Sequence, residues 1–418
     1  MNRSLSDSVA LASGATLSNR LVKAAMSEGI ADANNDVTPR LVSLYRRWSE
    51  SGAGMLLTGN VQVDRHHLER PGNIVLDFNT DRGALKKVAA AGSVVGNHLW
   101  MQLSHTGRQV SSSINPSPLQ PSSVAINVPP GLKASYARPR AMTEAEIVHA
   151  IGQFAFAARS ARETGFTGVQ LHAAHGYLIS QFLNPLANHR TDAWGGSLKN
   201  RARFLLETIS AVRKSVGTDF PVAIKLNSSD FQKGGFTNEE CVQLVHWLNE
   251  TSLDLLELSG GSLEQPKVVG VSITDEGVDA RPESTIRREA YFIDYAARVR
   301  AVAKMPVMVT GGFRTVSAMT ESLRNGELDI VGFGRPMLVD TKLPWRILNG
   351  QAETAPTPEA ALNVFHLLPW FNAQLERLSD GLEPDLGLTG EDSVALFGAR
   401  ESRLLSELLD QRRARRFA

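Results

Sequence analysis

Short apolar runs alternate with longer amphipathic segments along most of the chain. Eight runs have the length of a buried parallel strand, and they begin at Leu21, Gly54, His98, Gly168, Pro221, Leu253, Pro306 and Leu328. Between them, helical periodicity predicts helices in "TPRLVSLYRRWSES", "TEAEIVHAIGQFAFAARSARETG", "NRARFLLETISAVRKSVG", "TNEECVQLVHWLNET", "REAYFIDYAARVRAVAK" and "TVSAMTESLRNGE". The second of these opens with the capping-box pattern of Thr143 and Glu146 and closes on Gly165. A weaker pattern predicts one more helix between Asp81 and Ala91.

This alternation predicts an α/β protein in which residues 1–350 form a (β/α)8 TIM barrel. A doubly wound open sheet is the alternative, but the number and spacing of the strands favour the barrel. The Pro- and Ser-rich stretch from Ser111 to Arg140 follows the third strand, and we interpret it as an extended loop over the active mouth. Residues 351–418 form a C-terminal extension with helical patches, which we expect to pack on the barrel or on a neighbouring copy.

Composition and charge narrow the class of protein. The 418 residues carry a formal net charge of +1, so no bulk field recruits nucleic acid or an acidic membrane. No apolar run approaches the ~20 residues of a membrane span, and the N-terminus lacks the apolar core of a signal peptide. The one cysteine, Cys241, excludes an internal disulfide and a cysteine-rich metal or iron–sulfur site. We therefore expect a soluble, cytoplasmic protein, whose assembly into a homo-oligomer stays open.

Polar residues gather where the predicted strands end, which is where barrels of this kind carry their chemistry. Lys225 is a lone cation in the apolar strand "VAIKLN" and requires either an anion or the loss of its proton. His172 and His175 have spacing that would suit a metal pair, but a catalytic metal needs a third ligand, and no companion strand end offers one. We therefore predict no metal site.

Glycines end the last two predicted strands, at Gly311-Gly312 and in "GFGRP". This is where barrels most often bind phosphate, through backbone N–H groups that a side chain would block. A phosphate site beside a cation, an amide and a His/His/Tyr set suits flavin mononucleotide (FMN). The pyrimidine edge of FMN can bind an amide, and a lysine would stabilise its reduced form.

Four segments resemble the old yellow enzyme family of FMN-dependent oxidoreductases. The longest is "HAAHGYLISQFLNPLANHRTDAWGGSLKNR", and "MQLSHTGRQ", "GGF" and "GFGRPML" match other family segments in the right order. The similarity extends roughly from Leu17 to Gly350, and a motif this long is far more specific than a short pattern. The fold of the family is the (β/α)8 barrel predicted above.

The resemblance implies a role for each candidate residue. His172 and His175 would bind the activating oxygen of a substrate, and Tyr177 would donate a proton. Gln102 would bind the flavin pyrimidine, and Lys225 would lie beside the N1/O2 edge. Further cofactor contacts would come from Ala25, Met26, Ser27 and Asn60, and phosphate contacts from Gly312, Gly334 and Arg335.

Three positions depart from the common family pattern. Ala25 stands where the family commonly has Pro, Ser27 where it has Thr or Cys, and Lys225 where it has Arg. Lysine keeps the charge but loses the bidentate fork of arginine. These departures affect the expected redox potential and rate, not the identity of the cofactor.

The implied function is FMN-dependent reduction of activated alkenes, such as α,β-unsaturated carbonyl compounds, with NADH or NADPH as electron donor. NADH or NADPH would bind in the substrate pocket and reduce the flavin there before the substrate enters, so turnover would be ping-pong. Two other classes remain open: a Schiff-base barrel lyase with Lys225 as nucleophile, and a non-catalytic flavin-binding protein. A colourless protein would favour the lyase, and a flavin that NAD(P)H does not bleach would favour the binding protein.

Overall fold

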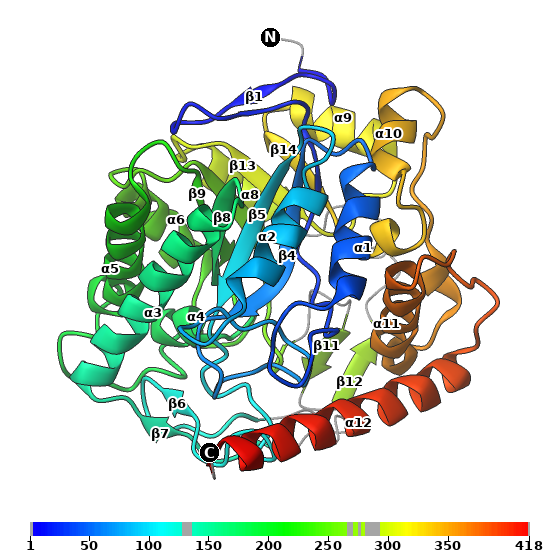
Figure 1. Ribbon diagram of the computed structural model, residues 1–418. Helices are drawn as coiled ribbons and strands as arrows, with labels where there is room; N and C mark the ends of the chain where they lie inside the picture. Colours follow the sequence, from blue (N-terminus) through cyan, green and yellow to red (C-terminus); the bar gives the residue numbers. More distant parts are fainter. Residues whose placement is uncertain (1–2, 128–135, 266–270, 275–276, 281–292, 417–418) are drawn as a thin grey trace.

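The computed structural model describes residues 3–127, 136–265, 271–274, 277–280 and 293–416. Eight parallel strands close into a barrel in chain order, with β10 paired to β13 and the last strand paired to the first (Figure 1). The strands are β3 (Leu21–Lys23), β4 (Met55–Gln62), β5 (His98–Ser104), β8 (Gly168–Ala173), β9 (Val222–Asn227), β10 (Leu255–Ser259), β13 (Val307–Thr310) and β14 (Ile330–Phe333). The predicted (β/α)8 barrel is confirmed, and each strand falls within or next to a predicted apolar run.

Helices follow the strands and cover the outside of the barrel (Figure 1). The capping box at Thr143 and Glu146 forms as predicted, and Asp81 caps the helix for which the sequence signal was weak. Of the predicted helix in residues 288–304, the first five residues lie outside the described part of the chain. The helices are α1 (Pro39–Ser49), α2 (Arg82–Ala91), α3 (Glu144–Glu163), α5 (Leu198–Val216), α6 (Asn238–Leu248), α8 (Ile293–Arg300), α9 (Val316–Arg324) and α10 (Leu343–Leu348).

An N-terminal hairpin closes one end of the barrel. Its strands are β1 (Val9–Ala10) and β2 (Thr16–Leu17), and the sequence pattern did not indicate them. Val9, Leu11 and Leu17 pack into one apolar cluster with residues from the barrel interior, including Trp100 and Met308. Full burial stabilises each such side chain by roughly 1.5–3 kcal/mol. The half of the barrel next to this hairpin is therefore a filled hydrophobic core, and the chemistry belongs to the other end.

The extended loop after β5 and the C-terminal helices lie at that other end. The loop contains the short strands β6 (Leu119–Gln120) and β7 (Arg140–Ala141), and part of it lies outside the described residues. A separate two-stranded sheet, β11 (Val271–Thr274) with β12 (Gly277–Ala280), follows β10. The extension contains α11 (Val364–Ser379) and α12 (Gly390–Arg416), and α12 crosses the molecule at the end opposite the N-terminal hairpin (Figure 1).

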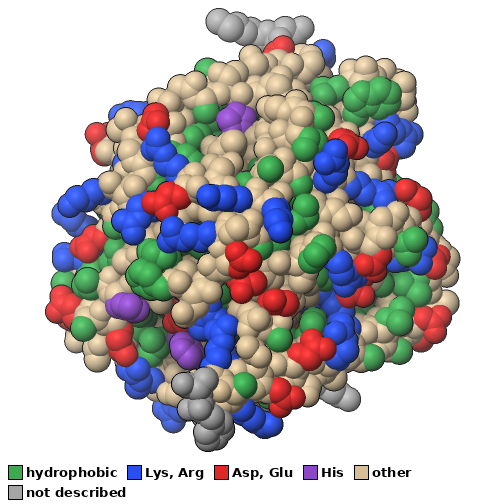
Figure 2. Space-filling model, viewed as in Figure 1, with side chains coloured by type: hydrophobic (Ala, Val, Ile, Leu, Met, Phe, Trp, Pro, Cys, Tyr) green, Lys and Arg blue, Asp and Glu red, His purple; other side chains and the backbone are tan. Residues whose placement is uncertain are grey.

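On the face that Figure 2 shows, Lys and Arg side chains are interspersed with Asp and Glu. This mixture agrees with the near-zero net charge of the chain. Within the described residues, none of the helices has the length and apolar character that a membrane crossing requires.

Candidate functional site

Four buried polar side chains cross the interior of the barrel on four adjacent strands. Gln102 of β5 donates from Nε2 to Oε1 of Gln170 on β8 (2.7 Å), and Gln170 donates from Nε2 to Oε2 of Glu257 on β10 (2.7 Å). Oε1 of Glu257 forms an ion pair with Nζ of Lys225 on β9 (3.0 Å). The register explains these contacts, because Gln102 lies opposite Gln170, and Lys225 lies opposite Glu257. We call these four residues the interior network.

His172, His175 and Tyr177 come together at the end of β8. The ring centroid of His172 lies 5.0 Å from that of His175 and 4.8 Å from that of Tyr177, and both contacts are edge-to-face. His175 has a left-handed backbone (φ 61°), which turns the chain sharply, and Tyr177 is the N-cap residue of α4 (Leu178–Leu183). The sharp turn and the short helix bring the three rings together. The sequence pattern did not distinguish the turn from the helix.

Both histidines are neutral near pH 7. Burial lowers the pKa of His172 well below its ordinary value, and His175 and Lys225 add to this effect. The pKa of His175 is lowered by burial and by Lys225. Nδ1 of His172 accepts the N–H of Ala174 (3.3 Å), so its proton is on Nε2. Nε2 of His175 lies 2.7 Å from the hydroxyl of Ser259.

A second set of polar contacts lies at the barrel mouth and involves Glu69, which the sequence analysis did not identify. Oε2 of Glu69 accepts from Oγ of Ser27 and from Nδ2 of Asn60, both at 2.6 Å. Oγ of Ser27 also lies 3.0 Å from Oδ1 of Asn60. Burial raises the pKa of Tyr177 well above its ordinary value, and the charge of Glu69 and a hydrogen bond with it raise it further. We call Ser27, Asn60, Glu69 and Tyr177 the mouth network.

The loop that carries Glu69 is fixed on one side by a carboxylate between two histidines. Oδ2 of Asp64 lies 2.9 Å from Nδ1 of His67 and 3.7 Å from Nε2 of His105. The remaining ring nitrogens accept backbone N–H groups, of Leu119 for His67 and of Gly107 for His105 (both 3.0 Å). Burial and the charge of His67 lower the pKa of His105 to about 4. The three side chains are close enough to suggest a metal site, but these bonds engage all four ring nitrogens, so the cluster joins two loops.

Helix α12 fixes the other side of the same loop. Arg70, next to Glu69, forms an ion pair with Glu401 of α12 (2.5 Å) and donates to Oδ1 of Asn372 of α11 (2.7 Å). The guanidinium also lies over the ring of Phe397 (4.9 Å). Further along α12, Leu408 is buried against side chains of the barrel-mouth loops, including Leu68 and Ile114.

The predicted phosphate-binding residues lie at neighbouring strand ends. Gly311 and Gly312 follow β13 with φ values of 115° and 85°, which only glycine adopts readily. Gly334 follows β14, and a Cβ added there would come no closer than 3.9 Å to its nearest neighbour, Sδ of Met26. Arg335 starts the 3-10 helix η2 (Arg335–Leu338), with its guanidinium 5.8 Å from the ring centre of Phe371 in α11. Ala25, partly buried, packs against the apolar cluster of the barrel interior.

The donor and acceptor set of this end of the barrel fits FMN. A cation and an amide, Lys225 of β9 and Gln102 of β5, stand on the inner wall two strands apart and suit the two polar edges of a pyrimidine. The open backbone at Gly334 leaves room for a phosphate. Nδ1 of His172 and Nε2 of His175 are engaged by Ala174 and Ser259, so the other ring nitrogens of the two histidines are the ones that can bind a further molecule. Sequence reasoning missed Gln170 and Glu257, although each is a polar residue in an otherwise apolar strand, "GVQLHA" and "LLELS".

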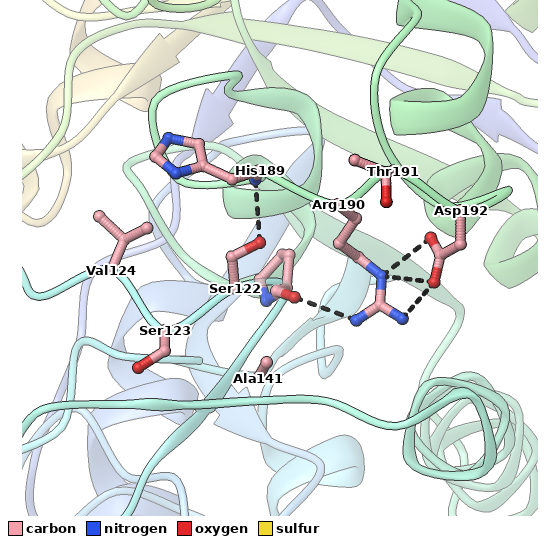
Figure 3. A pocket seen from close by; sticks show the side chains of 9 residues that line it. Ser122, Ser123, Val124, Ala141, His189, Arg190, Thr191 and Asp192 are labelled. Carbon is pink, nitrogen blue, oxygen red and sulfur yellow. Dashed lines mark hydrogen bonds and ion pairs between the residues drawn. The ribbon is translucent and has the colours of Figure 1, made fainter.

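A separate open pocket of about 410 Å³ lies between the loop after β5 and the segment after α4 (Figure 3). Arg190 spans it, with an ion pair to Asp192 (2.5 Å) and a hydrogen bond to the carbonyl of Pro121 (3.0 Å). Ser122 Oγ accepts the N–H of His189 (2.9 Å), as Figure 3 shows. None of the predicted site residues lines this pocket, so its bonds serve to hold the extended loop on the barrel.

Comparison with known proteins gives a consistent picture. Residues 10–354 match the model of the NADH:flavin oxidoreductase / NADH oxidase family. The chain is 34% identical over 408 residues to the NADH-dependent flavin oxidoreductase nadA of Aspergillus parasiticus, a match that covers 94% of this chain and 89% of that protein. It is 36% identical over 352 residues to the NADH-dependent flavin oxidoreductase iliE of Neonectria sp., covering 80% of this chain but 46% of that longer protein.

Solved structures agree with the fold. The old yellow enzyme homologue of Zymomonas mobilis superposes with a TM-score of 0.71 at 25% identity, covering 85% of this chain and 96% of that one. A 2-naphthoyl-CoA reductase in complex with 2-naphthoyl-CoA gives a TM-score of 0.77 at 26% identity, covering 91% of this chain and 58% of that one.

Proposed function

Because the chain belongs to the NADH:flavin oxidoreductase / NADH oxidase family, we propose that it reduces the carbon–carbon double bond of α,β-unsaturated carbonyl compounds. The family assignment makes it an oxidoreductase that uses FMN, with NADH or NADPH as electron donor. Bound FMN would supply the hydride chemistry that connects NAD(P)H to the β-carbon of the alkene. The residues that we assign to FMN all lie within 1–350, and the extension 351–418 supports the mouth of the site.

The first task of the protein is to polarise the substrate. Nε2–H of His172 is available as a donor because Nδ1 accepts the N–H of Ala174. His175 can donate from Nδ1 when the hydroxyl of Ser259 donates to its Nε2. Two neutral donors aimed at one carbonyl oxygen would stabilise the negative charge that develops there as the β-carbon accepts hydride.

The second task is to supply a proton to the α-carbon, which we assign to Tyr177. Its raised pKa keeps the hydroxyl protonated at neutral pH, so a proton is present at the start of each turnover. The T-shaped contact with His172 holds the phenol ring beside the imidazole that would bind the substrate oxygen. Glu69 and Asn60 interact with this hydroxyl, and the charge of Glu69 raises its pKa.

The observation that carries this proposal is the convergence of the three rings at the end of β8, with centroids 4.8 and 5.0 Å apart. We further propose that NAD(P)H and the alkene use this one pocket in turn, which gives ping-pong turnover. The ion pair between Lys225 and Glu257 argues against the Schiff-base lyase, since a nucleophilic amine needs its lone pair free.

Separate variants of the rings test the proposal. Changing His172→Ala should weaken binding of phenols, whose oxyanion resembles the charged carbonyl oxygen, and should slow alkene reduction about a hundredfold. Changing Tyr177→Phe should leave phenol binding and reduction of FMN by NAD(P)H almost intact, and should slow alkene reduction about a hundredfold. Stopped-flow absorbance measures the two half-reactions separately. A Tyr177→Phe variant that reduces alkenes normally but accepts electrons slowly from NAD(P)H would sink the proton-donor role.

A further inference from the structure

Glu257 is the one carboxylate of the interior network, and the ring chemistry proposed above does not use it. Its side chain is fully buried on β10 and is in contact with two neighbours, Gln170 and Lys225. An ionised carboxylate can accept hydrogen bonds but cannot donate them. One buried anion therefore constrains both of its neighbours, and through them the two residues that we assign to the flavin pyrimidine.

The first constraint runs along the amides. Because Glu257 only accepts, Gln170 must present its NH2 to it, which leaves Oε1 of Gln170 facing Gln102. Gln102 must then present its own NH2 to Gln170 (2.7 Å). Its carbonyl oxygen is left to accept a bond, and the N3–H of a flavin pyrimidine is a donor. The negative charge of Glu257 thus sets the orientation of the Gln102 amide, which is connected to it through Gln170.

The second constraint concerns charge. Lys225 lies 3.0 Å from Glu257, so much of its positive charge is already balanced when a flavin lies beside it. A lysine without this partner would stabilise the extra negative charge of reduced FMN more strongly. The pair provides a cation that fits the pyrimidine edge without binding the reduced form too tightly.

We propose that Glu257 is a positioning residue that orients Gln102 through Gln170 and moderates the effect of Lys225, thereby setting both FMN affinity and FMN redox potential. This inference rests on the proposed placement of FMN against Gln102 and Lys225. It concerns the cofactor alone, and it can be tested without any alkene substrate.

The test uses Glu257→Gln in the holoprotein, with redox titration and FMN binding as readouts. Glutamine replaces one of the two accepting oxygens of Glu257 with an NH2 donor, so either Gln170 or Lys225 then faces a donor. The amide chain therefore loses its fixed orientation. We expect oxidised FMN to bind about tenfold more weakly, because a buried donor is left unpaired. We also expect the affinity ratio of reduced to oxidised FMN to rise about tenfold, a shift of about 30 mV in midpoint potential for two electrons.

A matched variant separates the two effects. Changing Gln170→Leu interrupts the amide chain but leaves the Lys225–Glu257 pair, so FMN affinity should fall equally in both redox states, with no change in potential. It also keeps the test decisive if Glu257→Gln does not fold. Full FMN affinity in Gln170→Leu overturns the orienting role, and an unchanged potential in Glu257→Gln overturns the moderating role.

Lys225→Met distinguishes failure of this inference from failure of the proposed placement of FMN. If Lys225→Met lowers the potential or empties the site while Glu257→Gln changes nothing, only the role of Glu257 is wrong. If Lys225→Met also leaves potential and occupancy unchanged, FMN does not lie against Lys225, and the proposed placement fails with it.

Discussion

The interior network and the mouth network serve the same end of the barrel but are held in different ways. Gln102, Gln170, Lys225 and Glu257 stand on four adjacent strands, and none of these residues is more than 4% exposed. Ser27 and Tyr177 lie just beyond strands, and Glu69 stands on a loop that α12 holds through its neighbour Arg70. The first network depends on strand register, and the second depends on contacts between segments far apart in the chain. Damage to the first should alter cofactor properties, and damage to the second should alter chemistry at the mouth.

The largest effect should come from breaking the ion pair of the interior network. Lys225→Met leaves the carboxylate of Glu257 buried without its cation, and such losses cost about 3–5 kcal/mol of unfolding free energy. Replacing both residues, as Lys225→Met with Glu257→Leu, should recover most of this loss, since a buried pair can often be replaced by apolar side chains. Urea unfolding of the FMN-free proteins measures the difference.

The control is Lys304→Met, which breaks an ion pair of the same 3.0 Å length on the surface. The side chains of Lys304 and Glu250 are 69% and 76% exposed, so the change should cost less than about 1 kcal/mol. Equal losses of unfolding free energy in Lys225→Met and Lys304→Met would mean that burial does not make the interior ion pair more costly to break.

A smaller effect should follow from releasing the mouth loop. Arg70→Met removes the ion pair to Glu401 and the hydrogen bond to Asn372, and should destabilise the protein by about 1–3 kcal/mol. The loop should become susceptible to protease near Glu69 while FMN stays bound, because the interior network is untouched. Limited proteolysis with flavin absorbance measures both. Arg403→Met, which removes an exposed ion pair on the same helix, is the control and should leave the loop protected.

The smallest effect should be a shift in pH dependence from Glu69→Gln. In the proposed role of Tyr177 as an acid, alkene reduction is lost as the pH rises through the pKa of its hydroxyl. Removing the negative charge of Glu69 lowers that pKa, so the alkaline limb of the pH profile should move to lower pH. The pH profile of the oxidative half-reaction measures this. A limb that stays in place, or moves equally in the exposed control Glu239→Gln, would exclude the interaction.

The sequence could predict more of the interior network than of the mouth network. The eight strands, and Lys225 as a lone cation in an apolar strand, were readable because burial on a strand leaves a local pattern. Gln170 and Glu257 carried the same signal, but a single polar residue in a buried strand does not reveal its partner. Glu69 had no local signal, since its role comes from a fold that brings it to Ser27, Asn60 and Tyr177. The N-terminal hairpin and α4 escaped because two-residue strands and a six-residue helix are too short for periodicity to mark.

The anchoring of Arg70 by α12 also constrains the order in which the protein can mature on the ribosome. Arg70 and Glu401 are separated by 331 positions, so at typical rates of synthesis the anchor is made about 20–60 s after the loop. During that time the strands of the barrel can already pair, while the loop next to Tyr177 has no partner on its outer side. A nascent chain that stops before Gly390 would carry the interior network but an unsupported mouth. The completion of the mouth network is therefore expected to be a late event in biogenesis, after the barrel itself has formed.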